Sequence, residues 1–330
     1  MKHIAALRMG VVVIAMLTVA FALSASAGAL PAAGPSGPHM AFMSMRDGQA
    51  DIYSMQASGL AQINLTHDAT VGLRTDSEPA WSQDGQWIAF QRSAVKGLGS
   101  QLFLVKSDGS QLHALMPSPA FGVADKHPNW SPDGKTIVFS SNRTGHFELY
   151  AVKASGGGLV RLTFTAAGVD NLEPAWSPDG STIAFVRIYP TASIETSSAI
   201  FGLSLASGST YRMTTPGMGH NDCQPAWSPN SQRIAFESDR AGTEDVYLID
   251  RKGNGLTRVT TWKSNEYHPT WAPDSSALGL ISDHSGATEI YTLQFPRVGS
   301  TLPPTIQQLT FDKAFKANPA WEHLAPVPGL

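Results

Sequence analysis

The chain has 330 residues, of which 42% are hydrophobic and only 15% are charged, so it can bury a sizeable core and is not intrinsically disordered. Its 23 basic side chains nearly balance its 26 acidic ones, and the sequence has no run rich in Lys or Arg, which argues against a nucleic-acid partner. Cys223 is the only cysteine, which excludes an intrachain disulfide. Stability must therefore come from packing.

The N-terminus has the pattern of a cleaved signal peptide. Lys2 and Arg8 precede Val11–Leu23, a run of 13 almost wholly apolar residues, and residues 25–27 supply the small side chains that a signal peptidase needs. As a helix this run would be about 20 Å long, short of the roughly 30 Å hydrocarbon layer, which disfavours an uncleaved anchor. We expect removal of residues 1–27 and a periplasmic or secreted protein with no membrane span after cleavage.

A Pro-x-Trp triplet recurs six times, at intervals of 44 to 51 residues. Its tryptophans are Trp81, Trp130, Trp176, Trp227, Trp271 and Trp321. A period of this length indicates one supersecondary unit per repeat. Because a repeated core needs the same aromatic side chain at the same place in every unit, we expect these tryptophans to pack between units.

Each unit repeats the same order of local signals. A Ser-Pro-Asp-Gly turn, as at residues 131–134, precedes a short apolar strand such as Ile137–Phe139. A polar loop such as residues 141–145 leads to a strand that carries Tyr150, and a Gly-bearing turn leads to a fourth strand ending in Leu-Thr, as at residues 162–163. Four short antiparallel strands in a unit of about 48 residues are typical of a propeller blade.

The two ends of the chain supply parts of the same blade. Residues 40–66 provide three strands without a first one, and residues 319–321 provide a first strand with nothing after it. Joining them closes the ring and leaves no unpaired edge. We therefore predict an all-β, six-bladed β-propeller of four-stranded antiparallel blades over residues 39–325, after a flexible tether at 28–38 and before a tail at 326–330.

The unit of Pro-x-Trp-Ser-Pro-Asp-Gly, an Ile-Ala-Phe strand, Ser-Asn-Arg-x-Gly, a Tyr strand and Leu-Thr resembles the TolB-like, WD40-like (PD40) propeller repeat. The resemblance covers essentially the whole mature chain and implies the fold more specifically than the function. Propellers of this type serve in periplasmic envelope proteins, in the front domains of prolyl-oligopeptidase-like peptidases and in oligogalacturonate lyase, so the resemblance implies a protein of one of these kinds. TolB has an α/β domain before its propeller, whereas only the signal and tether precede residue 40 here, so the resemblance implies a role borne by the propeller, the docking of a partner.

The residue before each repeat proline is a candidate site residue, because six equivalent positions would form a ring around the channel. These residues are Glu78, His127, Glu173, Gln224, His268 and Asn318. Acidic residues stand just upstream, at Asp76, Asp125, Asp170, Asp222 and Glu266. We therefore expect an acidic channel mouth, relieved by Lys126 and Lys316, on the face whose loops vary most between repeats.

Three interpretations of these residues remain open. They contact a basic or amino-terminal segment of a protein or peptide partner, or they hold a divalent cation through His127 and His268, or they are polar caps for backbone groups. Apart from that cation we expect no cofactor. Blades two and four differ from the other repeats, because residues 92–101 and 187–199 replace the tight polar loop with longer inserts.

Two classes of function are weighed. The first is a non-catalytic, monomeric module that binds a protein or peptide partner, such as an envelope protein, through the channel mouth. A peptidase is disfavoured because the sequence has no Gly-x-Ser-x-Gly elbow, and a His-Glu-x-x-His zinc helix is also missing. The alternative is a metal-dependent lyase of the oligogalacturonate lyase type acting on polyuronate, which would use His127, Gln224, His268 and His220.

Overall fold

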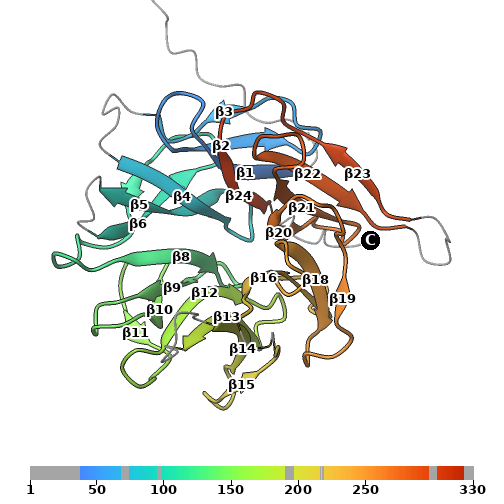
Figure 1. The fold of residues 1–330 in the computed structure, drawn as a ribbon. Helices are drawn as coiled ribbons and strands as arrows, with labels where there is room; N and C mark the ends of the chain where they lie inside the picture. Colours follow the sequence, from blue (N-terminus) through green and yellow to red (C-terminus); the bar gives the residue numbers. More distant parts are fainter. Residues whose placement is uncertain are drawn as a thin grey trace, which may run out of the picture. The chain divides into compact units, whose positions relative to one another are not determined.

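The computed structural model describes residues 38–67, 74–94, 99–189, 197–215, 217, 219–296 and 303–322. These residues form six antiparallel sheets of four strands each, which confirms the predicted six-bladed β-propeller (Figure 1). The signal peptide at 1–27, the tail at 326–330 and all of the tether except Pro38 lie outside the described residues. Within those residues, none forms a helix with the length and apolar character that a membrane crossing requires.

The blades are numbered along the chain, and each is given from its innermost strand outward. Blade 1 contains β24 (Lys316–Trp321), β1 (His39–Ser44), β2 (Asp51–Gln56) and β3 (Ile63–Asn64). Blade 2 contains β4 (Arg74–Trp81), β5 (Trp87–Ala94), β6 (Ser100–Lys106) and β7 (His113–Ala114). Blade 3 contains β8 (Asp125–Trp130), β9 (Thr136–Ser141), β10 (Glu148–Lys153) and β11 (Val160–Arg161).

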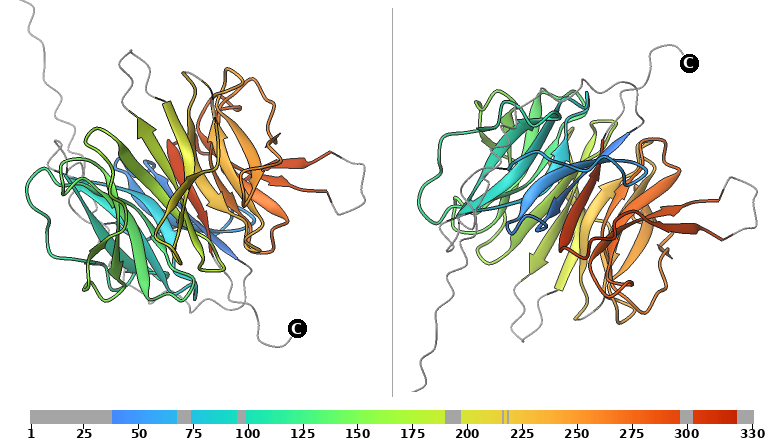
Figure 2. Two further views of the ribbon diagram at one scale, coloured as in Figure 1. Left: turned by 90° about the horizontal axis from the view of Figure 1, so that it is seen from below. Right: turned by 90° about the horizontal axis from the view of Figure 1, so that it is seen from above.

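The second half of the propeller has the same order. Blade 4 contains β12 (Asp170–Trp176), β13 (Thr182–Tyr189), β14 (Ser197–Ser204) and β15 (Thr210–Arg212). Blade 5 contains β16 (Asp222–Trp227), β17 (Arg233–Ser238), β18 (Asp245–Asp250) and β19 (Thr257–Arg258). Blade 6 contains β20 (Glu266–Trp271), β21 (Ala277–Ser282), β22 (Glu289–Gln294) and β23 (Thr305–Gln308). Its outer strand β23 is the longest outer strand of the six, and Figure 2 shows β22 and β23 extending outward from the propeller.

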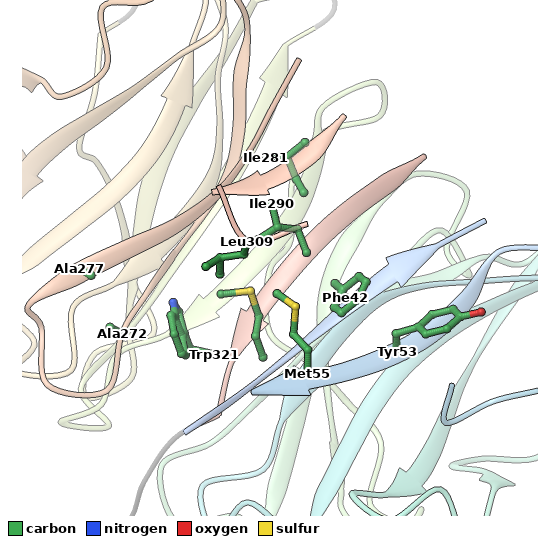
Figure 3. Close-up of a cluster of buried hydrophobic side chains, with 10 residues drawn as sticks. Phe42, Tyr53, Met55, Ala272, Ala277, Ile281, Ile290, Leu309 and Trp321 are labelled. Atoms are coloured by element: carbon green, nitrogen blue, oxygen red, sulfur yellow. The ribbon is translucent and has the colours of Figure 1, made fainter. Parts of the chain in front are cut away.

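The ring closes through blade 1, as the sequence predicts. β24 pairs with β1 in antiparallel register, with Met40 opposite Trp321 (Figure 1). Figure 3 shows the apolar cluster behind this closure, in which Phe42 of blade 1 lies in one buried core with Ile281 and Ile290 of blade 6. Because the first and last strands share one sheet and one core, no inner strand is left without a partner.

The Ser-Pro-Asp-Gly turns are closed by their own side chains. In blade 3, the Ser131 hydroxyl donates to Asp133 Oδ1 at 2.6 Å and accepts the backbone N–H of Thr136 at 3.0 Å. Blade 5 has Asn230 in place of the aspartate, and its Oδ1 accepts the Ser228 hydroxyl at 2.8 Å. The repeated turn therefore depends on an oxygen acceptor at its third position and not on a negative charge.

The Leu-Thr pairs lie just beyond the short outer strands, where the sequence places the strand ends. In blade 3 the Thr163 hydroxyl accepts the backbone N–H of Leu149 on β10 at 2.9 Å. The equivalent threonines in blades 1, 4, 5 and 6 accept the corresponding N–H at 2.9 to 3.0 Å. The threonine side chain therefore continues the hydrogen-bond ladder after the fourth strand has ended.

The repeat tryptophans join each blade to the preceding one. Four of them donate Nε1–H at 3.1 Å to the carbonyl of the middle residue of the preceding blade's triplet, and that residue is alanine each time. In the other two interfaces the middle residue is Asn129 or Thr270, and its side chain accepts the backbone N–H of Trp176 or Trp321 instead. The tryptophans therefore pack between blades, as the repeat predicts.

The polar loops and the connections between blades lie on one face, which we call the variable-loop face. Ala124, just before β8, donates its backbone N–H to Asn142 Oδ1 of the β9–β10 loop at 2.7 Å. Asn221 and Asp239 form the equivalent bond in blade 5 at 2.8 Å. The opposite side, which we call the turn face, carries the Ser-Pro-Asp-Gly turns. On the variable-loop side the blade 4 insert extends the paired strands, because Tyr189 still pairs with Ser197.

Candidate functional site

The six residues before the repeat prolines, which we call the channel ring, share an unusual backbone conformation. Their φ angles are 56° at Glu78, 52° at His127, 53° at Glu173, 52° at Gln224, 50° at His268 and 53° at Asn318. The pairing of each inner strand with its neighbour shifts register at this residue, which marks a β-bulge. Because left-handed backbone is costly for residues other than glycine, each ring position stores strain that the blade around it must hold.

The channel ring lines a single cavity of about 180 Å³. The triplet tryptophans line it too, as do Gln83, Pro132, Pro178 and Pro229 of the turns. The sequence predicts the site at the variable-loop end of the channel. The structure brings all six ring residues together, but the cavity that they line continues toward the turn face.

Hydrogen bonds connect ring residues of neighbouring blades. Asn318 donates its side-chain N–H to Glu78 Oε1 at 2.9 Å, and Gln224 donates its backbone N–H to Glu173 Oε2 at 2.7 Å. The backbone N–H of His268 is donated to Glu237 Oε2 at 2.9 Å. Glu237 lies on the second strand of blade 5, opposite Cys223, and was missed from the sequence. The sequence feature that could have identified Glu237 is a carboxylate directly after the apolar Ile-Ala-Phe strand, where the other blades have uncharged residues.

The three ring-facing carboxyl groups are held in an environment that favours their neutral form. Burial raises the pKa of Glu78, of Glu173 and of Glu237 to about 7. A protonated His268 would lower the pKa of Glu78, the negative charges of Glu173 and Glu237 raise it, and the Asn318 hydrogen bond lowers it. Near neutral pH these groups therefore exchange protons readily, and a cationic or hydrogen-bond-donating ligand would change their ionisation.

The two ring histidines are neutral at physiological pH. Burial lowers the pKa of His127 to about 3 and also lowers the pKa of His268. The Nδ1 atom of each ring is buried, without a hydrogen-bond partner among the described residues. Each imidazole therefore keeps unused hydrogen-bonding capacity in the channel wall.

The upstream acids, which we call the acid layer, lie between strands and do not line the cavity. Asp76 accepts both Nε–H and Nη2–H of Arg92 at 2.7 Å and also pairs with Arg74. Asp125 pairs with Arg143 at 2.7 Å, and Asp222 pairs with Arg240. Glu266 accepts hydrogen bonds from Ser264 and Ser282. Three of these four acids are thus neutralised by arginines, and the channel mouth is less acidic than the sequence alone indicates.

Blades 4 and 1 differ from this pattern in the acid layer. In blade 4 the equivalent position is Asn171, which accepts Arg187 Nε–H at 2.9 Å, whereas Asp170 accepts the backbone N–H of Phe147. In blade 1 the position is Lys316, which is fully buried and lies 2.9 Å from Glu289 of blade 6. Lys316 therefore links two blades and does not relieve charge at the channel mouth.

Four exposed phenylalanines lie in three of the connections on the variable-loop face. Phe121, Phe164 and Phe311 are 85%, 75% and 71% exposed, and Phe315 is 49% exposed. Each lies in a connection from the outer strand of one blade to the inner strand of the next. These residues could not be predicted from the sequence, because a phenylalanine in a loop carries no sequence signal that separates an exposed ring from a buried one.

The lyase alternative gains no support from the arrangement of these residues. His220 lies on the variable-loop face, where its Nδ1 is 3.2 Å from Asp239, and it does not belong to the cavity wall. In the part of the chain that the structure describes, no group of three or more His, Cys, Asp or Glu side chains is arranged to hold a metal ion. A divalent cation at His127 and His268 stays a prediction.

Six antiparallel blades around a channel lined by polar side chains place the chain among the six-bladed β-propellers. The family model described as PD40, TolB beta propeller domain, matches residues 93–194 and 172–323, which is more than half of the chain. The chain belongs to this family, as its repeat predicts.

Named relatives agree with this assignment. The Tol-Pal system protein TolB of Bordetella pertussis is 30% identical over 242 residues, which are 70% of this chain and 51% of that protein. This chain thus spans about half the length of that relative. The crystal structure of TolB from Acinetobacter baumannii superposes with a TM-score of 0.68 at 17% identity, covering 88% of this chain and 68% of that one. Oligogalacturonate lyase from Vibrio parahaemolyticus has a TM-score of 0.52 at 14% identity, covering 79% and 76%, so both structures show a shared fold alone.

Proposed function

We propose that this protein is an exported, non-catalytic, monomeric propeller of the periplasm that binds a protein partner through its variable-loop face. The observation that carries the proposal is the set of phenylalanines exposed there, at Phe121, Phe164, Phe311 and Phe315. Water-exposed aromatic rings cost free energy in a free protein and supply anchor residues at protein interfaces. The name Tol-Pal system protein, carried by the relatives, supports an envelope partner.

The loops that carry these rings are well suited to present them. Phe311 and Phe315 lie on either side of Asp312, whose carboxylate is 3.2 Å from Arg46 of blade 1. The backbone N–H of Met45 is donated to the Phe315 carbonyl at 3.0 Å. This connection is therefore fixed to the neighbouring blade, and a partner that binds it would lose little conformational entropy in ordering the loop.

The channel ring would take part where a segment of the partner reaches into the channel. The carboxyl groups of Glu78, Glu173 and Glu237 and the imidazoles of His127 and His268, whose Nδ1 atoms have no hydrogen-bond partner among the described residues, offer hydrogen-bonding groups to such a segment. This keeps the ring residues of the sequence analysis within the proposed site. It assigns Asp76, Asp125, Asp222 and Glu266 to the internal structure of the blades.

A non-catalytic role fits the environment of the single cysteine in the sequence. Cys223 is largely enclosed, with its sulfur 3.3 Å from the Ser198 hydroxyl. Burial raises the pKa of the Cys223 thiol, and the nearby charges of Glu173 and Glu237 raise it further. The thiol therefore stays protonated, whereas a thiolate is the form that attacks substrates.

The test is capture of partners from an envelope extract with the mature protein, followed by measurement of the dissociation constant for the partner identified. The triple variant Phe121→Ser, Phe164→Ser and Phe311→Ser should weaken binding about tenfold or more, because it removes three apolar anchors. The control is Leu60→Ser with Leu256→Ser, which alters two exposed leucines in the β-turns before the outer strands on the turn face, 67% and 48% exposed.

Unchanged binding by the phenylalanine variant, or an equal loss with the leucine control, would contradict the proposed face. The variant His127→Ala with His268→Ala then reports on the channel. If it leaves both partner binding and metal binding as in the wild type, the channel ring is structural and only the loops bind. Fractionation of cells that produce the tagged protein tests export, and recovery in the cytoplasm would overturn the periplasmic assignment.

A further inference from the structure

A groove beside the channel lies on the turn face, between blades 2 and 3, and shares Gln83, Trp130 and Pro132 with the channel lining. Its volume is about 490 Å³, within the roughly 300–1,000 Å³ that small-molecule sites occupy. Trp87 and His113 of blade 2 and Trp130 of blade 3 line it, together with Asp84 and Asp133 of the two turns. We call it the inter-blade groove. It has no role in the proposed partner binding.

The groove lies where the sequence departs from its own repeat. Trp87 begins the second strand of blade 2, directly after the turn. The equivalent positions in blades 3 to 6 hold Thr136, Thr182, Arg233 and Ala277. Since those blades form the same strand and turn with small or polar residues, the fold does not require a tryptophan here. Its half-buried indole packs against the core shared by blades 2 and 3 and also lines this groove.

The aromatic side chains of the groove form a wall, and the Trp87 ring in it is already contacted by His113 and Lys106. The His113 ring meets Trp87 edge-on, with 5.6 Å between ring centroids and an interplanar angle of 88°. Lys106, which pairs with Trp87 across the strands, has its Nζ 5.6 Å from the centre of the indole. Because this ammonium group already lies over the ring, the groove has a positive charge beside its aromatic wall.

The two aspartates place hydrogen-bond acceptors at the rim. In each, Oδ1 holds the turn by accepting a serine hydroxyl at 2.6 Å, from Ser82 to Asp84 and from Ser131 to Asp133. The bonds from Ser131 and from the Lys135 backbone keep the pKa of Asp133 below its usual value, so it stays ionised at neutral pH. In the described ranges neither forms an ion pair within 4.0 Å, whereas Asp179 of blade 4 lies 3.1 Å from Arg251.

We propose that the inter-blade groove binds a neutral sugar unit of a glycan. The apolar face of a pyranose ring would pack against Trp87, and its hydroxyl groups would donate to Asp84 and Asp133. The groove offers acceptors at the rim and an aromatic surface in the wall, which match a ligand that has many O–H donors and a flat apolar face. A cationic ligand fits less well, because Lys106 repels it from the indole.

Binding is tested by titrating maltose, cellobiose and diacetylchitobiose into the mature protein, with choline as the cationic comparison. Calorimetry and tryptophan fluorescence measure the binding in each titration. We expect saturable binding of at least one disaccharide and none of choline. Trp87→Thr, which installs the residue of blades 3 and 4, should weaken that binding about tenfold or more. Arg233→Thr is the matched control at the same position of blade 5 and should bind as the wild type does.

Asp133→Asn gives a second variant in which folding is preserved, because Asn230 closes the same turn in blade 5. It should weaken sugar binding with no change in melting temperature. The proposal is overturned if none of the three sugars binds, if choline binds in their place, or if Trp87→Thr retains full sugar affinity. These outcomes do not depend on the phenylalanine variants, so this proposal and the partner proposal can fail separately.

Discussion

The acid layer and the channel ring lie two residues apart on the same inner strands, yet their carboxyl groups are in opposite electrostatic environments. Asp76 is fully buried between Arg74 and Arg92, and its charge is compensated. Glu78 faces the channel without a basic partner in the described residues, and burial raises its pKa to about 7. Proximity in sequence is therefore a poor guide to the role of a carboxylate.

The reason for the difference is the bulge. In a regular strand, residues two apart point to the same side of the sheet. The left-handed residue at each ring position breaks this alternation, so that the side chain before the proline faces the axis while the acid two residues earlier packs between strands. The backbone thus separates structural acids from channel residues, and variants of each should behave differently.

The largest effect is expected in the acid layer. Asp76→Ala leaves the guanidinium groups of the buried Arg74 and the half-buried Arg92 without their shared carboxylate, and we expect a loss of about 3–5 kcal/mol in the free energy of unfolding. Urea denaturation measures it. Asp76→Asn is the milder comparison, since Asn171 occupies this position in blade 4 and still binds Arg187. Equal stability of Asp76→Ala and wild type would show that these ion pairs do not hold the blade.

A Glu78→Gln variant should gain stability, and the gain should depend on pH. The pKa of Glu78 is about 7 in the folded state against an ordinary value of 4.5, so the folded protein keeps a proton that the unfolded chain loses as pH rises from 4.5 to 7. Folding stability therefore falls over that range for wild type, and glutamine removes the penalty. We expect no difference below pH 4.5 and a gain of about 3 kcal/mol at pH 8.

The groups that face Glu78 set the conditions for this measurement. They are Glu173, Glu237, His268 and the Asn318 amide. His127 and His268 have lowered pKa values, so their contribution to the free energy of unfolding is present above pH 6.5 and is lost as pH falls below it. At pH 8 both are neutral in the folded and unfolded states, and the comparison reports on the carboxyl group. A gain that is equal at pH 4 and pH 8 would contradict a raised pKa.

The smallest effect concerns backbone strain in the channel ring. At His127, where φ is 52°, glycine adopts the left-handed conformation more easily than alanine does. We expect His127→Gly to be more stable than His127→Ala by about 1 kcal/mol, measured by thermal unfolding. Because both variants remove the imidazole, the difference isolates the backbone. A more stable alanine variant would show that the ring position relaxes once its side chain is removed.

The fold was readable from the sequence because each blade repeats its local chemistry. Proline and glycine fix the turn between the first two strands, and the tryptophans mark where blades meet, so six copies fix the blade number and the closure. The ring was readable for the same reason, since equivalent positions in a closed propeller must converge. Sequence position alone could not show the left-handed backbone or the direction in which the cavity continues.

The rest of the site depends on contacts that a repeat does not encode. The arginine partners of Asp76 and Asp222 come from the neighbouring strand β5 and from the loop after β17, so their neutralisation appears only in three dimensions. Glu237 reaches the ring from a second strand, and Phe164 is exposed although Phe139, also in blade 3, is fully buried. Burial and pairing are properties of the assembled blades, and one sequence does not state them.

Closure through β24 has a consequence for how the chain folds while it is being synthesised. Blade 1 needs a strand that lies some 280 residues further along the chain, at Lys316–Trp321. Until that strand has been synthesised and has arrived, β1 presents an open edge to whatever surrounds it, and long-range pairing of this kind is slow. An exported chain would meet this hazard on the far side of the membrane, and the arrival of β24 would end it.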